Sequence, residues 1–447
     1  MSEPRYRLTL AGPQGRRHTA FWSPHNSALH WEDGAPVDLS GINARYVAPR
    51  ALAPAFPVSP QTPAGKSRAV RVLKIQLGLK CNYSCQYCSQ AHQPHDSQGD
   101  PTDVAHFLAT LPNWLEGAPQ RIEFWGGEPF VYWKTLKPLA EALRDRFPEA
   151  GFGIVSNGAL LDDDKIDWLD RLGFGIGISH DGPAMKYRGP DPLDNPKQRA
   201  ALRLLFDRLA PLGRMSFNAV LHRNNASLGA VRRHIAEKLG VPAERLPLVT
   251  EEVMLPYDEG GRRLSLQTEK HGRAYMATVF WEAVRGESMA VSTIRDKITG
   301  FFRGIAESMP AAALGQKCGM DDAHRLAVDL KGNAITCQNM SAQTRHGIGH
   351  VEAFEDIRLD TAWHWSVREE CGRCPLLPLC QGACLFLEDD LWRQACDNSW
   401  WHNLAIFAAA LYWLTRLVLV EIEGPARRAG LPERVAVIDP ESLEAAA

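Results

Sequence analysis

The sequence predicts an α/β fold in which a parallel barrel is followed by a cysteine-rich C-terminal module. From residue 70 onward, short strand-like runs alternate with amphipathic helical runs such as WKTLKPLAEALRDRF and DKIDWLDRLG. Repeated βα units favour a parallel sheet whose chemistry lies in the loops after the strands. In addition, all ten cysteines fall within positions 81–88 or 318–396, so two regions of the chain concentrate thiol chemistry.

The elements are expected in the following order. Residues 1–48 form a small strand-rich segment, since RYRLTLAG and SALHWED alternate polar and apolar residues, and the Pro- and Ala-rich residues 49–68 form a linker. The barrel covers residues 69–261, with strands at 71–79, 121–125, 152–156, 174–179, 215–221 and 246–251. It is followed by a helical bridge (262–309), the cysteine module (310–400) and a C-terminal helix and tail (401–447).

Composition indicates a cytoplasmic protein. Lys and Arg number 50 against 52 Asp and Glu, so no excess charge favours nucleic acid or a membrane surface as a partner. The first thirty residues lack the pattern of a signal peptide, and reduced cysteines fit the cytosol. The apolar run at 404–420 is short for a membrane span and contains Arg416, so we expect a buried helix there.

The motif CNYSCQYC places Cys81, Cys85 and Cys88 directly after the first expected barrel strand, with no fourth cysteine nearby. Three thiolates on a four-iron cluster leave one iron free for a ligand other than protein. A zinc knuckle or three buried thiols is the alternative on these residues alone. With Tyr87 before the last cysteine, the motif resembles that of radical S-adenosylmethionine (SAM) enzymes.

This resemblance implies a 4Fe–4S cluster on the three cysteines. The free iron would bind SAM, and an electron from the cluster would split SAM into methionine and a 5′-deoxyadenosyl radical. The six βα units likewise resemble the partial (β/α)6 TIM-type barrel of that family.

The remaining seven cysteines resemble the SPASM module, which carries auxiliary iron–sulfur clusters. Their spacing reads C-x13-G-x4-C, then C-x2-C-x5-C-x3-C, then a last cysteine eleven residues on. The resemblance implies two auxiliary 4Fe–4S clusters, hence three in all. The outer one would be held by Cys371, Cys374, Cys380 and Cys396, and the inner one by Cys318, Cys337 and Cys384. Asp322 or His324 is a candidate further ligand of the inner cluster, which otherwise has an open site; a zinc-only module is the alternative.

Short motifs at the ends of later strands resemble the SAM-binding loops of the family. EFWGGEPF contains Gly126, Gly127 and Glu128, where glycines permit close backbone approach and the carboxylate can accept a bond from the SAM ammonium. The further residues assigned to SAM by resemblance are Tyr87, Ser156, Asn157, Ser179 and Arg188, with Asp181 bracing the SHDGP loop. Ordinary turn chemistry is the alternative for these Asn-Gly and Asp-Gly pairs.

The family resemblance implies a maturase that oxidatively modifies a ribosomally made peptide, forming a carbon–carbon or thioether crosslink. Candidate bases after the last barrel strand are Glu251, Glu252 and Asp258. Expected partners are a precursor peptide or protein and an electron donor such as flavodoxin or ferredoxin, with no nucleic acid and no membrane.

Three other functions are alternatives on the sequence. A formylglycine-forming sulfatase maturase is disfavoured by Trp125 and by Gln338, an amide that cannot take a proton where those enzymes carry Asp. Tailoring of a tetrapyrrole or another small molecule is the second alternative. The third is a zinc scaffold without catalysis.

Overall fold

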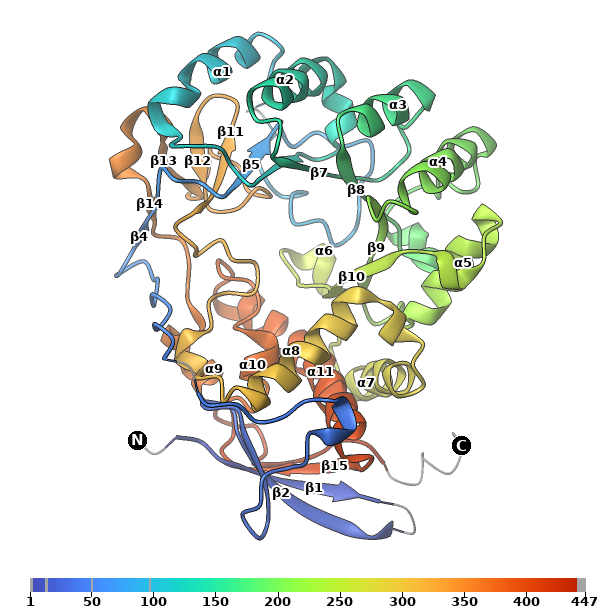
Figure 1. The fold of residues 1–447 in the computed structure, drawn as a ribbon, viewed down its shortest axis with the longest axis vertical. Coiled ribbons are helices and arrows are strands. Elements are labelled where there is room, and N and C mark those ends of the chain that lie inside the picture. Colours follow the sequence, from blue (N-terminus) through green and yellow to red (C-terminus); the bar gives the residue numbers. More distant parts are fainter. Residues whose placement is uncertain (1–2, 13–14, 50, 96–97, 440–447) are drawn as a thin grey trace.

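An open arc of parallel strands forms the upper part of the molecule (Figure 1). The computed structural model describes residues 3–12, 15–49, 51–95 and 98–439. The strands of the arc pair in chain order and are β5 (Val72–Gln76), β6 (Arg121–Trp125), β7 (Gly151–Ser156), β8 (Phe174–Ser179), β9 (Met215–Leu221) and β10 (Leu248–Val253). Each lies within a few residues of a predicted strand, and the predicted α/β partial barrel is confirmed.

Five helices cover the outside of the arc. They are α1 (Asp103–Trp114), α2 (Trp133–Arg146), α3 (Asp163–Arg171), α4 (Pro196–Leu209) and α5 (Leu228–Leu239). Asp162, Asn195 and Ser227 precede α3, α4 and α5 and accept hydrogen bonds from backbone N–H groups of the first turn, as helix N-caps do. Because each helix returns the chain to the start of the next strand, the loops after the strands gather at one end of the barrel.

The C-terminal module extends this sheet, which the sequence did not predict. Strand β11 (Arg325–Asp329) pairs in parallel with β5, and β12 (Asn333–Ile335) and β13 (Gly347–His350) continue the sheet in antiparallel order. The Gln76 side chain at the end of β5 donates to the carbonyls of Gln338 (2.7 Å) and Met340 (2.8 Å). The segment that follows Cys337 therefore lies beside the cysteine-bearing end of the barrel.

Helices form the lower part of the molecule. They are α6 (Glu259–Arg262), α7 (Glu269–Val284), α8 (Ser292–Ala306), α9 (Glu369–Gly372), α10 (Leu377–Cys380) and α11 (Asp389–Thr415). The prediction of a helix over 404–420 was wrong at its C-terminal end. Helix α11 stops at Arg416, whose left-handed φ of 59° caps the helix, and the next apolar residues form a strand.

That strand, β15 (Val418–Glu423), joins the N-terminal strands in a second sheet at the base of the molecule (Figure 1). The sheet order is β16-β15-β1-β2-β3, and the remaining members are β1 (Tyr6–Ala11), β2 (Arg17–Ser23), β3 (Ala28–Trp31) and β16 (Arg434–Ala436). In the expected linker, β4 (Ala64–Gly65) pairs with β14 (Arg358–Leu359). Both ends of the chain thus contact the cysteine module: the Tyr6 hydroxyl donates to the Arg373 carbonyl, and Arg427 donates to the Cys396 sulfur.

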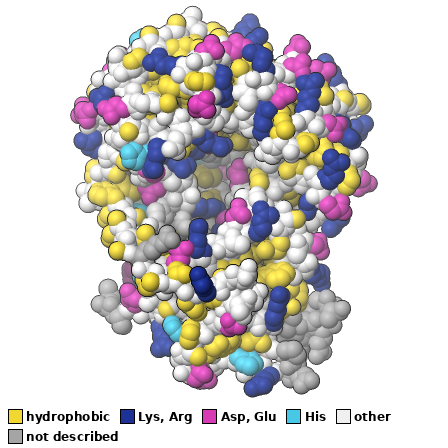
Figure 2. All heavy atoms as spheres, in the orientation of Figure 1, with side chains coloured by type: hydrophobic (Ala, Val, Ile, Leu, Met, Phe, Trp, Pro, Cys, Tyr) yellow, Lys and Arg dark blue, Asp and Glu magenta, His cyan; other side chains and the backbone are white. Residues whose placement is uncertain are grey.

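One face of the molecule is hollowed near its centre, between the barrel and the lower helices, and charged side chains of both signs surround the hollow (Figure 2). In the part of the chain that the structure describes, no helix has the length and apolar character needed to cross a membrane.

Candidate active site

The three cysteines of CNYSCQYC lie in the loop after β5 and line one wall of a cavity. The cavity has an empty volume of about 1630 Å³, including open solvent at its mouth. Burial raises the pKa of the Cys85 thiol to about 11, and the neighbouring thiols of Cys81 and Cys88 add to this effect. A free thiol here keeps its proton at neutral pH, whereas a bound metal deprotonates it.

The loop after β6 packs its glycines directly against the strand end that carries these cysteines. A Cβ atom added to Gly127 would lie 2.3 Å from the Lys80 carbonyl oxygen, and one added to Gly126 would lie 2.8 Å from the Gly78 carbonyl oxygen. The Gly127 N–H donates to Gly78 (3.0 Å) and the Glu128 N–H donates to Lys80 (3.0 Å). The glycines therefore bring Glu128 next to the cysteine loop.

Glu128 is a buried carboxyl group at 1 % exposure. Its oxygens accept hydrogen bonds from the Ser156 hydroxyl (2.9 Å) and from the backbone N–H groups of Asn157 (2.8 Å) and Phe130 (3.1 Å). Burial raises the pKa of Glu128 to about 7, although these hydrogen bonds oppose the shift. Among the described residues no lysine or arginine forms an ion pair with this carboxylate, so a ligand ammonium would fit the group.

The loop after β8 forms a second polar centre. Asp181 is fully buried and accepts hydrogen bonds from the Val220 N–H (3.0 Å) and from the Tyr87 hydroxyl. Arg188 is 10 % exposed, places its Nε 3.1 Å from Asp181, and lies 5.4 Å from the Tyr87 ring centroid. Tyr87, Arg188 and Ser179 all line the cavity. Asp181 contacts Tyr87 and Arg188 and so fixes their side chains.

The Ser156-Asn157 pair after β7 contacts the cysteine loop. The Asn157 amide donates to the Asn82 side chain at 2.7 Å and lies 3.9 Å from the Cys81 sulfur. Both residues are buried and both line the cavity. The structure therefore brings together every residue that the sequence assigned to SAM.

The three candidate bases occupy different environments. Glu251 is exposed and lines the cavity. Glu252 does not: its carboxylate, 13 % exposed, lies 2.5 Å from Lys297 Nζ and 2.6 Å from Lys317 Nζ. Asp258 caps α6 by accepting a hydrogen bond from the Gly261 N–H (2.7 Å). Ion pairing also holds the pKa of Glu252 well below its usual range despite burial, so Glu251 is the better-placed candidate base.

The seven C-terminal cysteines fall into two groups. One group lines a small cavity of about 410 Å³ and consists of Cys371, Cys374, Cys380 and Cys396. Arg427 donates to the Cys396 sulfur at 3.0 Å. The other group consists of Cys318, Cys337 and Cys384. Burial raises the pKa of Cys384 to about 12, and the nearby thiols of Cys318 and Cys337 also raise it.

The candidate ligands Asp322 and His324 are engaged elsewhere. Asp322 forms an ion pair with Arg71 (3.0 Å) and accepts a hydrogen bond from the His324 N–H (2.9 Å). The His324 ring bonds to the Ala69 carbonyl oxygen through Nδ1 (2.8 Å). Both side chains are thus held by contacts within the protein, and their role as ligands of the inner cluster stays a prediction. Within the described ranges, no three His, Cys, Asp or Glu side chains are grouped so as to hold a single metal ion.

The sequence-based prediction did not include Tyr257 and Asn339, which also line the cavity. Tyr257 lines the cavity, and its hydroxyl lies near the Cys384 thiol of the second group. Asn339 also lines the cavity and accepts a hydrogen bond from the buried Gln90 amide at 3.1 Å. Tyr257 follows the last barrel strand, as catalytic loop residues do, and Asn339 lies two residues after Cys337. These positions, after a strand and after a cysteine, are the signals by which the sequence could have predicted both residues.

Comparison with known proteins identifies the family. The model of the radical SAM superfamily matches residues 75–224, which carry the cysteine loop and the barrel motifs. The chain is a radical SAM enzyme. It therefore uses a 4Fe–4S cluster and SAM, and the three-thiol loop with the unpaired Glu128 fits both groups.

Individual relatives refine this relationship to anaerobic sulfatase maturases. A serine-type anaerobic sulfatase-maturating enzyme of Klebsiella pneumoniae is 25 % identical over 339 residues, covering 70 % of this radical SAM enzyme and 81 % of the relative. The radical SAM cyclopropyl synthase TigE of Paramaledivibacter caminithermalis is 24 % identical over 176 residues. That match spans only 35 % of this chain and 36 % of the synthase.

A solved structure confirms the fold. The structure of anSMEcpe with bound AdoMet and a Cp18Cys peptide superimposes with a TM-score of 0.54 at 18 % identity, covering 77 % of this chain and 98 % of that one. The likeness therefore includes the C-terminal cysteine-rich region as well as the barrel.

Proposed function

We propose that this radical SAM enzyme oxidatively modifies side chains of a ribosomally made precursor peptide, forming a carbon–carbon or thioether crosslink. The observation that carries the proposal is the composition of the cavity. Its walls hold the three-thiol loop and also Tyr257, whose hydroxyl lies near Cys384 of the C-terminal thiols. A substrate in this cavity would lie beside the radical-generating centre and near a second redox centre that would accept the second electron of the oxidation.

The residues have distinct roles in this proposal. Cys81, Cys85 and Cys88 would hold the first cluster, and the seven C-terminal cysteines would hold two auxiliary 4Fe–4S clusters. SAM bound at the first cluster supplies a radical able to take hydrogen from an unactivated carbon. Glu128 would accept the SAM ammonium, with Ser156, Asn157, Ser179 and Tyr87 around it.

The substrate end of the cavity has its own groups. Arg188 is held by Asp181 and would face a carboxylate of SAM or substrate. Glu251, exposed on the cavity wall, would accept the proton released as the new bond forms. Electrons would reach the enzyme from a small redox protein such as flavodoxin or ferredoxin.

Formylglycine formation is the second candidate, since the sulfatase maturases match 70 % of the chain. We place it second because Gln338, the residue after Cys337, offers an amide where a base is needed. The Gln338 amide therefore cannot receive a proton from substrate.

Mass spectrometry of short peptides encoded beside the gene tests the proposal. Each peptide would be co-expressed anaerobically with the enzyme and, as a control, with Cys85→Ala. We expect a peptide that loses two hydrogens only with the wild-type enzyme, and fragmentation should place the change at a crosslink. A carbonyl that reacts with a hydrazide would instead favour formylglycine. No mass change together with no deuterium uptake in heavy water would refute peptide modification.

A further inference from the structure

A short segment after β8, residues 187–190, holds the cysteine loop from outside and is called the strap below. The Tyr187 carbonyl accepts a hydrogen bond from the Gln86 N–H at 2.9 Å, and the Pro190 carbonyl accepts one from the Tyr83 hydroxyl at 2.6 Å. Gly189 packs against the Tyr83 ring so closely that an added Cβ would lie 3.0 Å from ring carbons. The strap therefore contacts the loop both between Cys81 and Cys85 and between Cys85 and Cys88.

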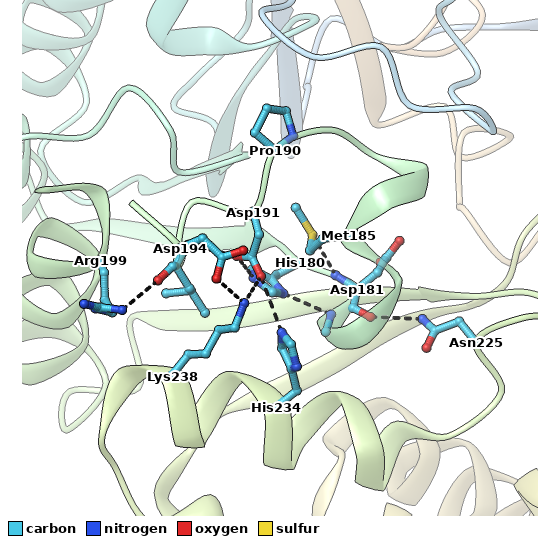
Figure 3. Close-up of polar contacts among 12 residues, drawn as sticks. His180, Asp181, Met185, Pro190, Asp191, Asp194, Arg199, Asn225, His234 and Lys238 are labelled. Carbon is cyan, nitrogen blue, oxygen red and sulfur yellow. Dashed lines mark hydrogen bonds and ion pairs between the residues drawn. The ribbon is translucent and has the colours of Figure 1, made fainter. Parts of the chain in front are cut away.

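Asp191 directly follows the strap, and its side chain is only 8 % exposed. Figure 3 shows His180, from the loop after β8, and His234 and Lys238, from α5, converging on this carboxylate. The Asp191 oxygens lie 3.0 Å from His180 Nε2, 2.7 Å from Lys238 Nζ and 3.4 Å from His234 Nε2, and one accepts from the Leu193 N–H at 2.8 Å. Asp191 thus links the end of the strap to the loop after β8 and to helix α5.

The hydrogen bonds of His180 fix its tautomer. Its Nδ1 accepts a hydrogen bond from the Gly182 N–H at 3.0 Å, so Nε2 carries the proton and donates to Asp191. The ring is fully buried, and burial lowers the pKa of His180, which keeps the imidazole neutral. Burial alone would raise the pKa of Asp191, but the His180 and Lys238 contacts outweigh it and hold the pKa well below its usual range.

Asp191 is therefore ionised at neutral pH, and its ion pair and hydrogen bonds hold the end of the strap in place. Lys238 supplies the balancing cation, and His234 lies four residues before it on the same face of α5. A buried carboxylate loses far more by losing such partners than an exposed one, because the unpaired charge stays out of water. Moving the strap away from the cysteine loop would break these contacts of Asp191 and incur this free-energy cost.

We propose that Asp191 is a positioning residue for the SAM-cleaving centre, acting through the strap to hold the cysteine loop in the geometry that binds SAM. The inference rests on the assignment of Cys81, Cys85 and Cys88 as cluster ligands. It does not depend on which substrate is modified. Its test therefore measures SAM binding and the effect of SAM on the cluster, without a peptide substrate.

Asp191→Asn removes the charge with little change of shape, and Asp194→Asn is the matched control. Asp194 pairs with the same Lys238 at 2.5 Å, but its side chain is 69 % exposed and does not contact His180. The reconstituted holoenzymes would be compared by equilibrium SAM binding and by the change that SAM causes in the electron paramagnetic resonance (EPR) spectrum of the reduced cluster. We expect SAM affinity to fall at least tenfold in Asp191→Asn, with an altered EPR change, and to stay within twofold in Asp194→Asn.

A second variant keeps the inference testable if Asp191→Asn fails to fold. Tyr83→Phe removes only the bond to the Pro190 carbonyl, and we expect it to weaken SAM binding at least threefold. In the double variant the two effects should not add, because both act through the strap. SAM affinity and EPR spectrum like those of the wild type in a folded Asp191→Asn enzyme, or in Tyr83→Phe, would overturn the inference.

Discussion

Glu128 should make the stability of the cofactor-free protein fall as pH rises. The carboxyl is buried without a cation among the described residues, and its pKa is raised from 4.5 to about 7. Between these two values the unfolded chain has released the proton while the folded protein still binds it. The stabilisation is therefore complete below about pH 4.5 and is lost as pH rises through 7.

The size of the effect follows from the shift. One pKa unit corresponds to about 1.4 kcal/mol, so the loss between pH 5 and pH 8 is about 2.5 kcal/mol. Glu128→Gln removes the titrating group, and the difference between the two stability curves isolates its contribution. Reversible urea unfolding of the reduced apoprotein at four pH values measures this difference.

A constant difference between wild type and Glu128→Gln across pH 5 to 8 would refute the reasoning. A ligand ammonium should favour the ionised form, so SAM affinity of the wild-type holoenzyme should decline below pH 7. The Gln variant should lack that decline. A decline of equal slope in both proteins would assign it to SAM itself.

Five further substitutions separate the roles of cavity residues from those of residues outside the cavity. Gly127→Ala should abolish SAM binding because its Cβ meets backbone at 2.3 Å, whereas Gly300→Ala, with open space around it, should bind SAM normally in the same titration. Glu251→Gln should stop peptide modification while 5′-deoxyadenosine still forms. Glu252→Gln should instead lower the free energy of unfolding by about 3 kcal/mol, because it leaves the buried Lys297 unpaired. The opposite pattern in chromatography and urea unfolding would reverse their roles. Tyr257→Phe should shift the potential of the inner auxiliary cluster to more negative values in an EPR redox titration, since a hydroxyl beside the Cys384 thiolate favours the reduced state. An unchanged potential would exclude an interaction of the Tyr257 hydroxyl with this thiolate.

The barrel could be predicted because its signals are local. Each strand is a short apolar run next to an amphipathic helix, and each SAM motif directly follows a strand. The pairing of β1 with β15 could not be predicted, since it joins residues such as Arg7 and Glu423 from opposite ends of the chain. The pairing of β11 with β5 also joins distant segments and depends on tertiary packing.

The candidate bases show why sequence position alone does not give a role. Glu251 and Glu252 are adjacent in sequence, yet one lines the cavity and the other is buried among lysines. A register shift between Thr250 and Val253 and a positive φ of 71° at Glu252 interrupt the strand here, so the direction of each side chain depends on the fold. Asp258, by contrast, precedes a short helix, and a cap could have been inferred from that pattern.

Transfer of deuterium from peptide to SAM-derived product tests the central claim most directly. The enzyme would be incubated anaerobically with SAM, a reductant and a precursor peptide carrying deuterium on its side-chain carbons, and 5′-deoxyadenosine would be analysed by mass spectrometry. A peptide maturase predicts deuterium in the 5′-deoxyadenosine, and none of this product with Cys85→Ala. Unlabelled 5′-deoxyadenosine formed at the same rate with and without peptide would contradict the account.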